Sequence, residues 1–269
     1  MGRTGPARRN KGYCRCRMRS VAHYQEIQPG ARLARYVECY WLREDSIGTP
    51  AHSVLPDGCV DILFTARNGE PTDLTIVGLM TKPQSFDIPS GQSYFGVRFR
   101  PGMASAFVPE ASRLNDKVEP LESAMGADAR RLFEQIGDTG SPKQMVETVE
   151  RFLRPLEPPD RAHRALDHLS ACDLSVDRLA TKSGISVRQL RRACLQRAGV
   201  SPKFLSRILR FRRAAEHIAK AANQTNPVAW AEVAAACGYF DQAHFIREFQ
   251  EFTGSTPGRY LQSLPNRSL

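Results

Sequence analysis

The chain has 269 residues, of which 41% are hydrophobic, enough to bury the core of one large domain or of two ordinary ones. Its formal net charge is +10, and no run approaches the ~18 consecutive apolar residues of a membrane span, which excludes an integral membrane protein. The N-terminus also lacks the apolar stretch of a signal peptide, so we expect a cytoplasmic protein.

The positive charge is distributed unevenly along the chain. Residues 1–20 carry seven Lys or Arg and no acid, residues 21–159 carry 14 against 19 acids, and residues 160–269 carry 17 against 9. Phosphate neutralisation by Lys and Arg supplies most of the non-specific affinity for DNA. Contact with a polyanion is therefore expected from the C-terminal part alone.

The seven cysteines include no CxxC pair and no Cys/His spacing typical of a zinc site. Free cysteines are among the most buried residues in proteins, so we expect reduced and mostly buried thiols. Cys14 and Cys16 stand in a basic segment, where redox activity is the alternative.

The first 17 residues are rich in glycine and basic residues and have almost nothing to bury, which predicts a disordered extension. Met18 directly precedes the first amphipathic stretch. Translation from Met18 instead of Met1 is therefore a second expectation.

Short strand-like runs dominate the next segment, up to about residue 107, with turns at Pro56-Asp57-Gly58 and Pro101-Gly102. The predicted strands are Ser53–Leu55, Val60–Phe64, Leu74–Leu79 and Tyr94–Phe99. They indicate a small β-rich unit.

Helical spacing follows the predicted strands. It covers Met103–Val108, Leu121–Ile136 and Pro142–Leu153. The proline-rich residues 154–159 cannot continue a helix and predict a linker. We therefore expect an α+β domain at 18–155 and a second domain at 160–265.

Residues after the linker show helical patterns only. Ala162, Ala165, Leu166 and Leu169 form one apolar stripe, and a second begins after Ser175, a suitable N-cap. Lys203–Ala222 predicts a long helix that starts after Pro202 and carries arginines between its apolar positions. The second domain is therefore expected to be all-α.

An internal repeat with an offset of about 55 residues is the strongest pattern in the chain, and each copy has helix-turn-helix spacing. The first copy contains, in order, Leu179-Ala180, Gly184-Ile185, Ser186, Leu190 and Arg192. The second contains Val233-Ala234, Gly238-Tyr239, Asp241, Phe245 and Arg247, with one extra residue, Phe240. Similar segments, 198–202 and 253–257, follow both copies.

Each repeated residue type suits this motif. The alanines are small where two helices must approach, and Gly184 and Gly238 permit the turn between them. Ser186 and Asp241 can cap the second helix of each unit. These helices, expected at about 186–195 and 241–249, would bury Leu190 and Phe245 and present their other face to DNA.

The residues on that face have side chains suited to base recognition, since Arg and Gln match guanine and adenine edges and Ala or Ile can contact a thymine methyl. They are Arg188, Arg191 and Arg192 in the first unit and Gln242, Ala243, His244, Ile246 and Arg247 in the second. Arg191, Arg192, Gln242, His244 and Arg247 are expected nearest the base edges. Lys203, Arg207 and Ser255 are candidates for phosphate contacts.

The stretch from Leu174 to Tyr260 resembles the DNA-binding domain of the AraC/XylS transcription regulators. Residues 237–249 (CGYFDQAHFIREF) and 254–260 (GSTPGRY) follow the pattern of that family closely. The resemblance implies that Lys203–Ala222 rigidly joins two units and sets their recognition helices about one DNA turn apart. Cys194 departs from the family, which usually has a large aromatic residue there, so a looser core is expected in the first unit.

Residues 52–64 (HSVLPDGCVDILF) and 96–102 (GVRFRPG) are similar to an uncharacterised domain found upstream of AraC-type units. That resemblance implies no particular effector. Better-known members of the family use this position for ligand sensing or for dimerisation, commonly in a β-barrel. Both roles, and a barrel-like arrangement of the strands, therefore remain open.

Catalysis is the competing interpretation, because His52, Asp57, Cys59 and Asp61 lie close together in sequence. A metal-dependent barrel enzyme usually needs several histidine ligands, and the β-rich domain has only His23 and His52. No phosphate-binding loop, nucleophile elbow or HExxH motif is present. We expect no enzyme activity, metal or cofactor, with Asp57-Gly58 forming a turn and Asp61 accepting a hydrogen bond at a strand end.

The sequence thus predicts a sequence-specific transcription regulator that binds double-stranded DNA. A small-molecule effector, a homodimer and RNA polymerase are further expected partners, the last if the protein is an activator. The same DNA-binding unit serves activation or repression, depending on where its site lies relative to the promoter.

Overall fold

The computed structural model describes residues 23–156, 160–171, 175–222 and 228–264. The expected N-terminal extension, Met18, Cys14, Cys16 and Cys172 lie outside these ranges. No helix within the described ranges is both long and apolar enough to span a bilayer.

An antiparallel six-stranded sheet forms the centre of the N-terminal part, in the order β1-β2-β7-β4-β5-β8. Two further strands, β3 and β6, pair with each other in a separate two-stranded sheet. The strands are β1 His23–Ile27, β2 Val37–Asp45, β3 Thr49–Val54, β4 Val60–Arg67, β5 Glu70–Val77, β6 Gln84–Ile88, β7 Gln92–Phe99 and β8 Val118–Pro120. The large sheet is open, with β1 and β8 at its edges, so the strands do not close into a barrel.

The two faces of the large sheet have different surroundings, because alternate residues of a strand point to opposite sides. In β4, Ile62 and Phe64 are buried and belong to the core shared with α2 (Ala127–Gly137) and α3 (Pro142–Phe152). The Phe64 and Phe133 rings lie 5.5 Å apart, which brings α2 onto this face. The opposite face carries Asp61 and Leu63 and borders a cavity.

The four predicted strands are present, and the predicted helix Pro142–Leu153 is confirmed as α3 with Ser141 as its N-cap. The expected helix Leu121–Ile136 is interrupted: α1 (Leu121–Met125) ends at Gly126, which has a φ of 55°, and α2 starts after it. The expected helix at Met103–Val108 is only a short 3-10 turn, η1 (Ala104–Ala106).

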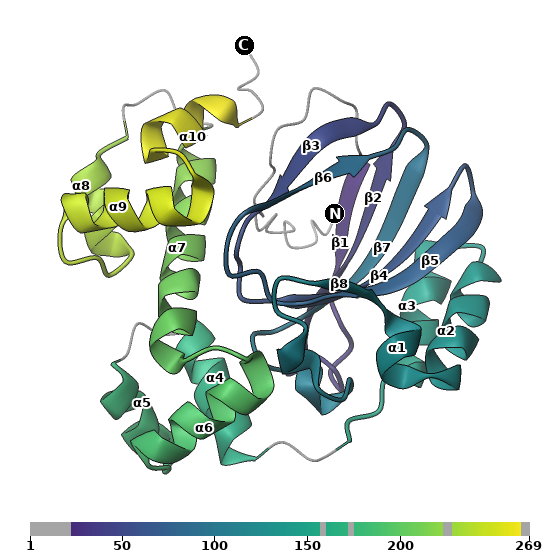
Figure 1. Cartoon of the computed structure of the whole chain (residues 1–269), viewed down its shortest axis with the longest axis horizontal. Helices are drawn as coiled ribbons and strands as arrows, with labels where there is room; N and C mark the ends of the chain where they lie inside the picture. Colours follow the sequence, from purple (N-terminus) through teal and green to yellow (C-terminus); the bar gives the residue numbers. More distant parts are fainter. Residues whose placement is uncertain (1–22, 157–159, 172–174, 223–227, 265–269) are drawn as a thin grey trace, which may run out of the picture.

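The C-terminal part is all-α among its described residues, as expected. It contains α4 Arg161–Ala171, α5 Val176–Ser183, α6 Val187–Ala198, α7 Pro202–Ala221, α8 Trp230–Ala236, α9 Gln242–Thr253 and α10 Pro257–Ser263. The 20-residue helix α7 joins a unit containing α5 and α6 to a unit containing α8, α9 and α10 (Figure 1). Ser201 caps it and Pro202 occupies its first turn, as the sequence predicts.

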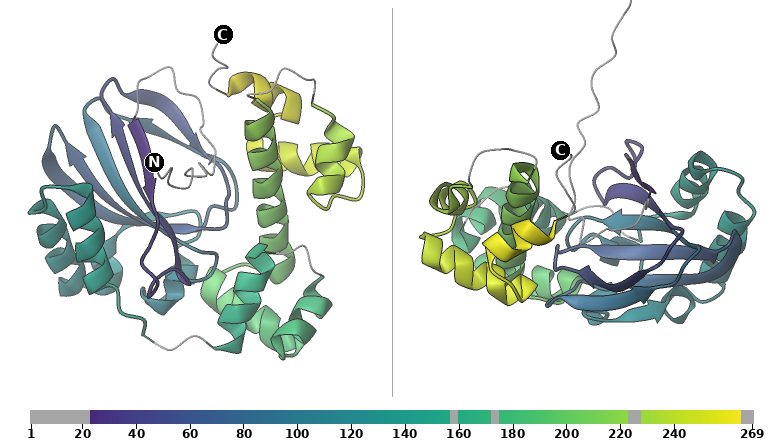
Figure 2. Two further views of the ribbon diagram at one scale, coloured as in Figure 1. Left: turned by 180° about the vertical axis from the view of Figure 1, so that it is seen from behind. Right: turned by 90° about the horizontal axis from the view of Figure 1, so that it is seen from above.

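The N-terminal part and the helices share one hydrophobic core. Figure 2 shows α7 alongside the large sheet, on the side opposite α2 and α3. The side-chain amide of Asn115 donates to the carbonyl of Ala198 at the end of α6, at 3.0 Å. Arg212 of α7 forms an ion pair with Glu38 of β2 at 2.5 Å. The sheet domain therefore contacts both the first helical unit and the connecting helix.

Candidate nucleic-acid interface

The first helix-turn-helix unit consists of α5 and α6. Gly184 ends α5 with a φ of 65°, a conformation that glycine adopts without strain. Ser186 and Gln189 then form a reciprocal cap, in which the Ser186 hydroxyl accepts from the Gln189 amide and the Gln189 side chain accepts from the Ser186 amide. Leu190 and Cys194 are fully buried against α5, so the opposite face of α6 points outward.

The second unit, α8 and α9, repeats this geometry. The amide of Tyr239 donates to the carbonyl of Ala234 at 2.9 Å, just as Ile185 donates to Ala180 at 3.1 Å in the first unit. Gly238 has a φ of 81°. Asp241 caps α9 by accepting from the His244 amide at 2.6 Å. The internal repeat of the sequence is thus a repeat of turn geometry as well.

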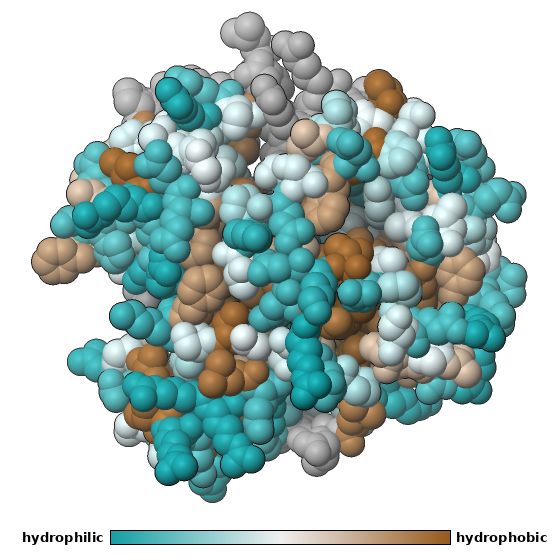
Figure 3. All heavy atoms as spheres, viewed as in Figure 1, coloured by the Kyte–Doolittle hydropathy of each residue, from teal (hydrophilic) through white to brown (hydrophobic). Residues whose placement is uncertain are grey.

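The outward face of α6 carries an uninterrupted positive charge. Arg188, Arg191 and Arg192 are all exposed, and none of them forms an ion pair with a residue in the described part of the chain. Figure 3 shows this helical unit at the lower left of the view, covered largely by hydrophilic residues. Leu195, with 53% of its surface exposed, adds an apolar group to the same helix that the sequence did not single out.

The outward face of α9 is less charged and more varied. Gln242, Ala243 and Arg247 are exposed, whereas His244 and Ile246 are half-buried. His244 packs edge-on against the Tyr239 ring, and its Nε2 lies 3.8 Å from the Glu248 carboxylate. Three of the five predicted residues are therefore exposed, and two are half-buried.

The candidates for phosphate contacts lie in different environments. Lys203 is exposed in the first turn of α7, and Ser255 is half-buried beside Thr253. Arg207 is already engaged, because its guanidinium donates to Glu248 at 2.8 Å and to Glu251 at 2.5 Å. Phosphate contact by Arg207 would require these ion pairs to open.

Glu248 is the residue of the interface that sequence analysis missed. Its side chain is only 4% exposed and accepts hydrogen bonds from both Arg207 and Arg210 of α7. This carboxylate therefore fixes the recognition helix α9 to the connecting helix. The sequence contains Glu248 and both arginines, but they lie about 40 residues apart, so no local pattern indicates that they pair.

Phe240 is a second residue whose role the sequence did not define. It is the extra residue of the second turn and is 91% exposed immediately before α9. An isolated exposed aromatic ring at this position can lie against a DNA backbone or another protein. The repeat shows that Phe240 is an inserted residue, but it does not show that the side chain is exposed.

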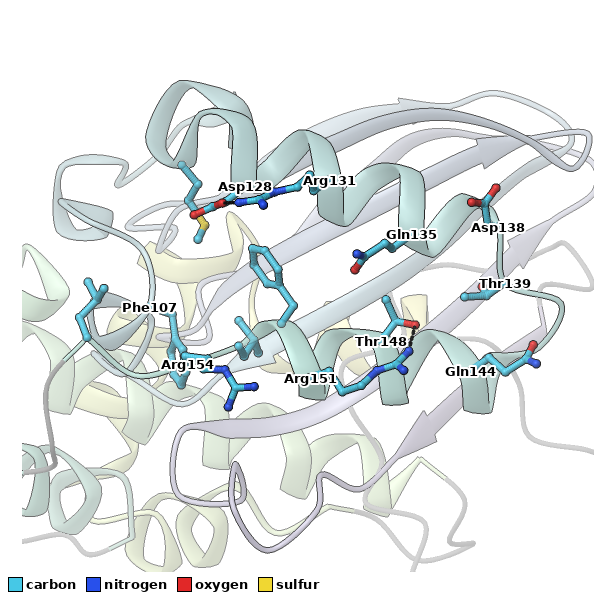
Figure 4. A pocket seen from close by; sticks show the side chains of 14 residues that line it. Phe107, Asp128, Arg131, Gln135, Asp138, Thr139, Gln144, Thr148, Arg151 and Arg154 are labelled. Carbon is cyan, nitrogen blue, oxygen red and sulfur yellow. Dashed lines mark hydrogen bonds and ion pairs between the residues drawn. The ribbon is translucent and has the colours of Figure 1, made fainter.

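Two hollows flank the sheet of the N-terminal part. One, of about 940 Å³, lies along α2 and α3 and is lined mainly by polar and charged side chains, including Arg131, Gln135 and Arg151 (Figure 4). The other, of about 410 Å³, lies between the opposite face of the sheet, β3, β6 and α7. Within the described residues, no group of three or more His, Cys, Asp or Glu is placed to hold a metal ion.

The four cysteines in the described ranges, Cys39, Cys59, Cys194 and Cys237, are buried free thiols. This confirms the expectation for these positions. Burial raises the pKa of the Cys194 thiol to about 12. Cys194 has no exposed surface and belongs to the hydrophobic core of the first unit.

Several solved structures are similar to the chain. The C-terminal domain of AraT, a response regulator from Geobacillus stearothermophilus, is 24% identical over 42% of this chain and 91% of that one, with a TM-score of 0.35. An AraC-type transcriptional regulator from Chromobacterium violaceum is 26% identical over 40% and 95%, with a TM-score of 0.34. ToxT from Vibrio cholerae O395 is 10% identical over 84% and 97%, with a TM-score of 0.42.

Protein-family models assign both parts of the chain, whereas a comparison with curated proteins finds no match. A domain of unknown function (DUF6597) matches residues 25–120, which span the large sheet. A helix-turn-helix domain matches residues 179–263, which contain both units described above. The chain therefore joins a segment that matches a domain of unknown function to a helix-turn-helix domain that contains both units.

Proposed function

We propose that this protein regulates transcription by placing α6 and α9 in two successive segments of the DNA major groove, about one helical turn apart. The observation that supports this function best is the repeat of turn and cap geometry at the two ends of α7. Each recognition helix also presents an exposed arginine at the equivalent position, Arg192 and Arg247.

Base recognition is assigned to exposed groups with suitable chemistry. Arginine can donate two hydrogen bonds to a guanine edge, and glutamine can pair with adenine in the same way. The residues proposed at base edges are Arg191, Arg192, Gln242, His244 and Arg247. Arg188, Ala243 and Ile246 complete the contact surface, and Lys203, Arg207 and Ser255 are proposed at phosphates.

Selection of genomic DNA fragments by the purified protein tests this function. We expect an enriched motif with two short boxes about one turn apart. Arg192→Ala should reduce base preference in one box and Arg247→Ala in the other box. Each substitution should weaken specific binding by roughly 1–3 kcal/mol. Arg113→Ala is a matched control, because Arg113 is exposed on the sheet domain and pairs only with nearby Glu110 among the contacts described.

Two results would contradict the proposed recognition mode. Equal losses on specific and random DNA would show that the arginines contact phosphates only. Loss of base preference in the same box with both substitutions would show that α6 and α9 do not read separate segments.

We further propose that the N-terminal domain, at about 18–155, controls the DNA-binding domain, at about 160–265, by binding a small molecule. The cavity beside α7 supports ligand sensing, because its volume of about 410 Å³ lies in the range of small-molecule sites. Homodimerisation is the alternative, and the polar lining of the hollow along α2 and α3 does not favour a large apolar interface there. Sedimentation of the full chain at several concentrations distinguishes the two.

Activation through RNA polymerase is the last part of the proposal. Transcription in vitro from a promoter carrying the selected motif tests it, with the motif placed upstream of or across the polymerase site. Increased transcript from the upstream position identifies an activator, whereas a decrease from the overlapping position identifies a repressor.

A further inference from the structure

The cavity between the sheet and α7 combines apolar walls with charged groups. Its walls come from three directions: the outer face of the large sheet, the β3–β6 pair, and one side of α7. Apolar side chains of each element line it, among them Leu63 of β4, Phe86 of β6 and Phe211 of α7. In Figure 3, hydrophobic residues gather near the centre of the face, over this sheet.

Aromatic rings give the cavity a specific shape. Trp41 stacks on Tyr24, with ring centroids 6.2 Å apart, and lies across the backbone of β7 at Gly96. A Cβ atom at Gly96 would fall 2.1 Å from the Trp41 ring, so only glycine leaves room for this arrangement. The Trp41 indole N–H is buried and faces the Asp61 carboxylate, an interaction that acts to lower the pKa of Asp61.

Carboxylates outnumber guanidinium groups around this space. The charged side chains that line it within the described ranges are Arg43, Arg98 and Arg212 against Asp57, Asp61, Asp87 and Glu216. Every one of these arginines is already paired. Arg43 binds Asp45, Arg98 binds Asp61 through two hydrogen bonds, and Arg212 binds Glu38 and Glu216.

Asp57 has a distant cationic contact. Its Oδ2 lies 3.7 Å from the Arg98 guanidinium, which is shared with Asp61 at 2.9 Å, and its side chain is 27% exposed. Burial next to other carboxylates raises the pKa of Asp57 and of Asp61 despite Arg98. A further cation in the cavity would offset this excess of negative charge.

We propose that the cavity binds a small organic cation, with its ammonium group near Asp57 and its apolar body among Trp41, Leu63 and Phe211. The Asp57 carboxylate, 3.7 Å from its cationic partner, supplies the opposite charge, and the apolar walls suit an organic body, so both features favour this class over an anionic ligand. The effect of this ligand on transcription rests on the function proposed above, whereas its binding to the cavity does not.

The position of α7 connects such a ligand to DNA recognition. Phe211 lines the cavity and also packs on Phe249 of α9, with ring centroids 5.2 Å apart. Arg212, the next residue, holds α7 to β2 through Glu38. An occupant of the cavity therefore touches the helix that positions the second recognition helix.

Three probes that share a phenyl ring on a four-carbon chain and differ in the charge of the terminal group test the ligand class. They are 4-phenylbutylamine, 4-phenylbutanol and 4-phenylbutyrate. The full chain with Trp230→Phe keeps Trp41 as its only tryptophan, so fluorescence reports directly on the cavity. We expect the amine to change Trp41 emission and to bind at least about tenfold more tightly than the other two. Asp57→Asn should weaken amine binding by at least about tenfold, whereas Asp138→Asn, on an exposed position beyond the sheet, should not.

Leu63→Phe provides a second variant, because a larger side chain at this half-buried position fills the cavity from the sheet side and leaves Trp41 as the only tryptophan. It should abolish amine binding while the chain remains folded and still selects its DNA motif. Tightest binding of the carboxylate, equal binding of all three probes, or no binding to a folded protein would each overturn the proposal. Since binding is measured without DNA, such a failure is distinguishable from a failure of DNA recognition.

Discussion

At the scale of single residues, Gly96 has a defined steric function. Its ideal Cβ position lies 2.1 Å from Trp41 Cε2 and 2.3 Å from Nε1, and a bulky ring cannot shift there without disturbing Tyr24. Gly96→Ala should therefore destabilise the protein by about 1–3 kcal/mol. Urea unfolding measures the loss, and Gly258→Ala, where a Cβ atom meets nothing within 4 Å, should leave stability nearly unchanged.

The buried His52 should make the stability of the protein depend on pH. Burial and the neighbouring Arg43 lower the pKa of His52 to about 4, although Asp45 acts in the opposite direction. Between pH 6.5 and 4 the unfolded chain therefore takes up a proton that the folded chain does not, and this group lowers stability as the pH falls. His52→Gln should reduce the difference in unfolding free energy between pH 7 and pH 5, and an unchanged difference would refute the assignment.

At the scale of secondary-structure elements, the attachment of α9 to α7 depends on one carboxylate. Glu248 is 4% exposed between Arg207 and Arg210, whereas Glu251 contacts Arg207 alone and is 55% exposed. Glu248→Gln leaves the partly buried Arg210 guanidinium without its counter-charge and leaves Arg207 with Glu251 alone, so it should cost about 1–3 kcal/mol. Glu251→Gln should cost no more than about 1 kcal/mol.

Thermal unfolding of these two variants, together with binding to the selected motif, distinguishes their effects. Glu248→Gln should weaken recognition of the box read by α9 more than that of the other box, because α6 does not contact Glu248 in the described contacts. Equal effects on both boxes would contradict an anchoring role for Glu248.

At the scale of the whole molecule, the sheet domain and the helices should unfold together, because one core contains residues of both. Trp41 lies in the sheet domain and Trp230 in α8, so single-tryptophan variants report on each part separately. We expect equal urea midpoints for the two probes in the otherwise unaltered chain.

Loss of the ion pair between the domains should separate those midpoints. Arg212→Met removes the ion pair between α7 and the half-buried Glu38. Lys220→Met is the control, since Lys220 is exposed near the end of the same helix. Coincident midpoints in Arg212→Met would show that apolar packing alone couples the two parts.

The sequence by itself determined the features that depend on local chain geometry. Gly184, Gly238, Ser186 and Asp241 define turns and caps within a few residues, so the repeat could be recognised and its helices placed to within four residues. The long helix after Pro202 was equally predictable. These signals need no knowledge of distant contacts.

The strands that the sequence missed depend on neighbours far along the chain. β1, β2, β6 and β8 contain polar residues, and Arg43 and Asp45 in β2 are buried only because they pair with each other beside Thr49 and His52. Hydrophobic alternation therefore does not identify these strands. Their existence depends on hydrogen bonds to β7, β5 and β3.

Only the tertiary structure decided the form of the sheet and the place of the cavity. An open sheet and a barrel can share the same strand pattern, since closure depends on which edges pair. The cavity combines residues from β1 to α7, and the ion pair between Glu38 and Arg212 spans 174 residues. Such long-range contacts leave no local pattern, which is why the DNA-binding helices were predictable and the site that we propose to control them was not.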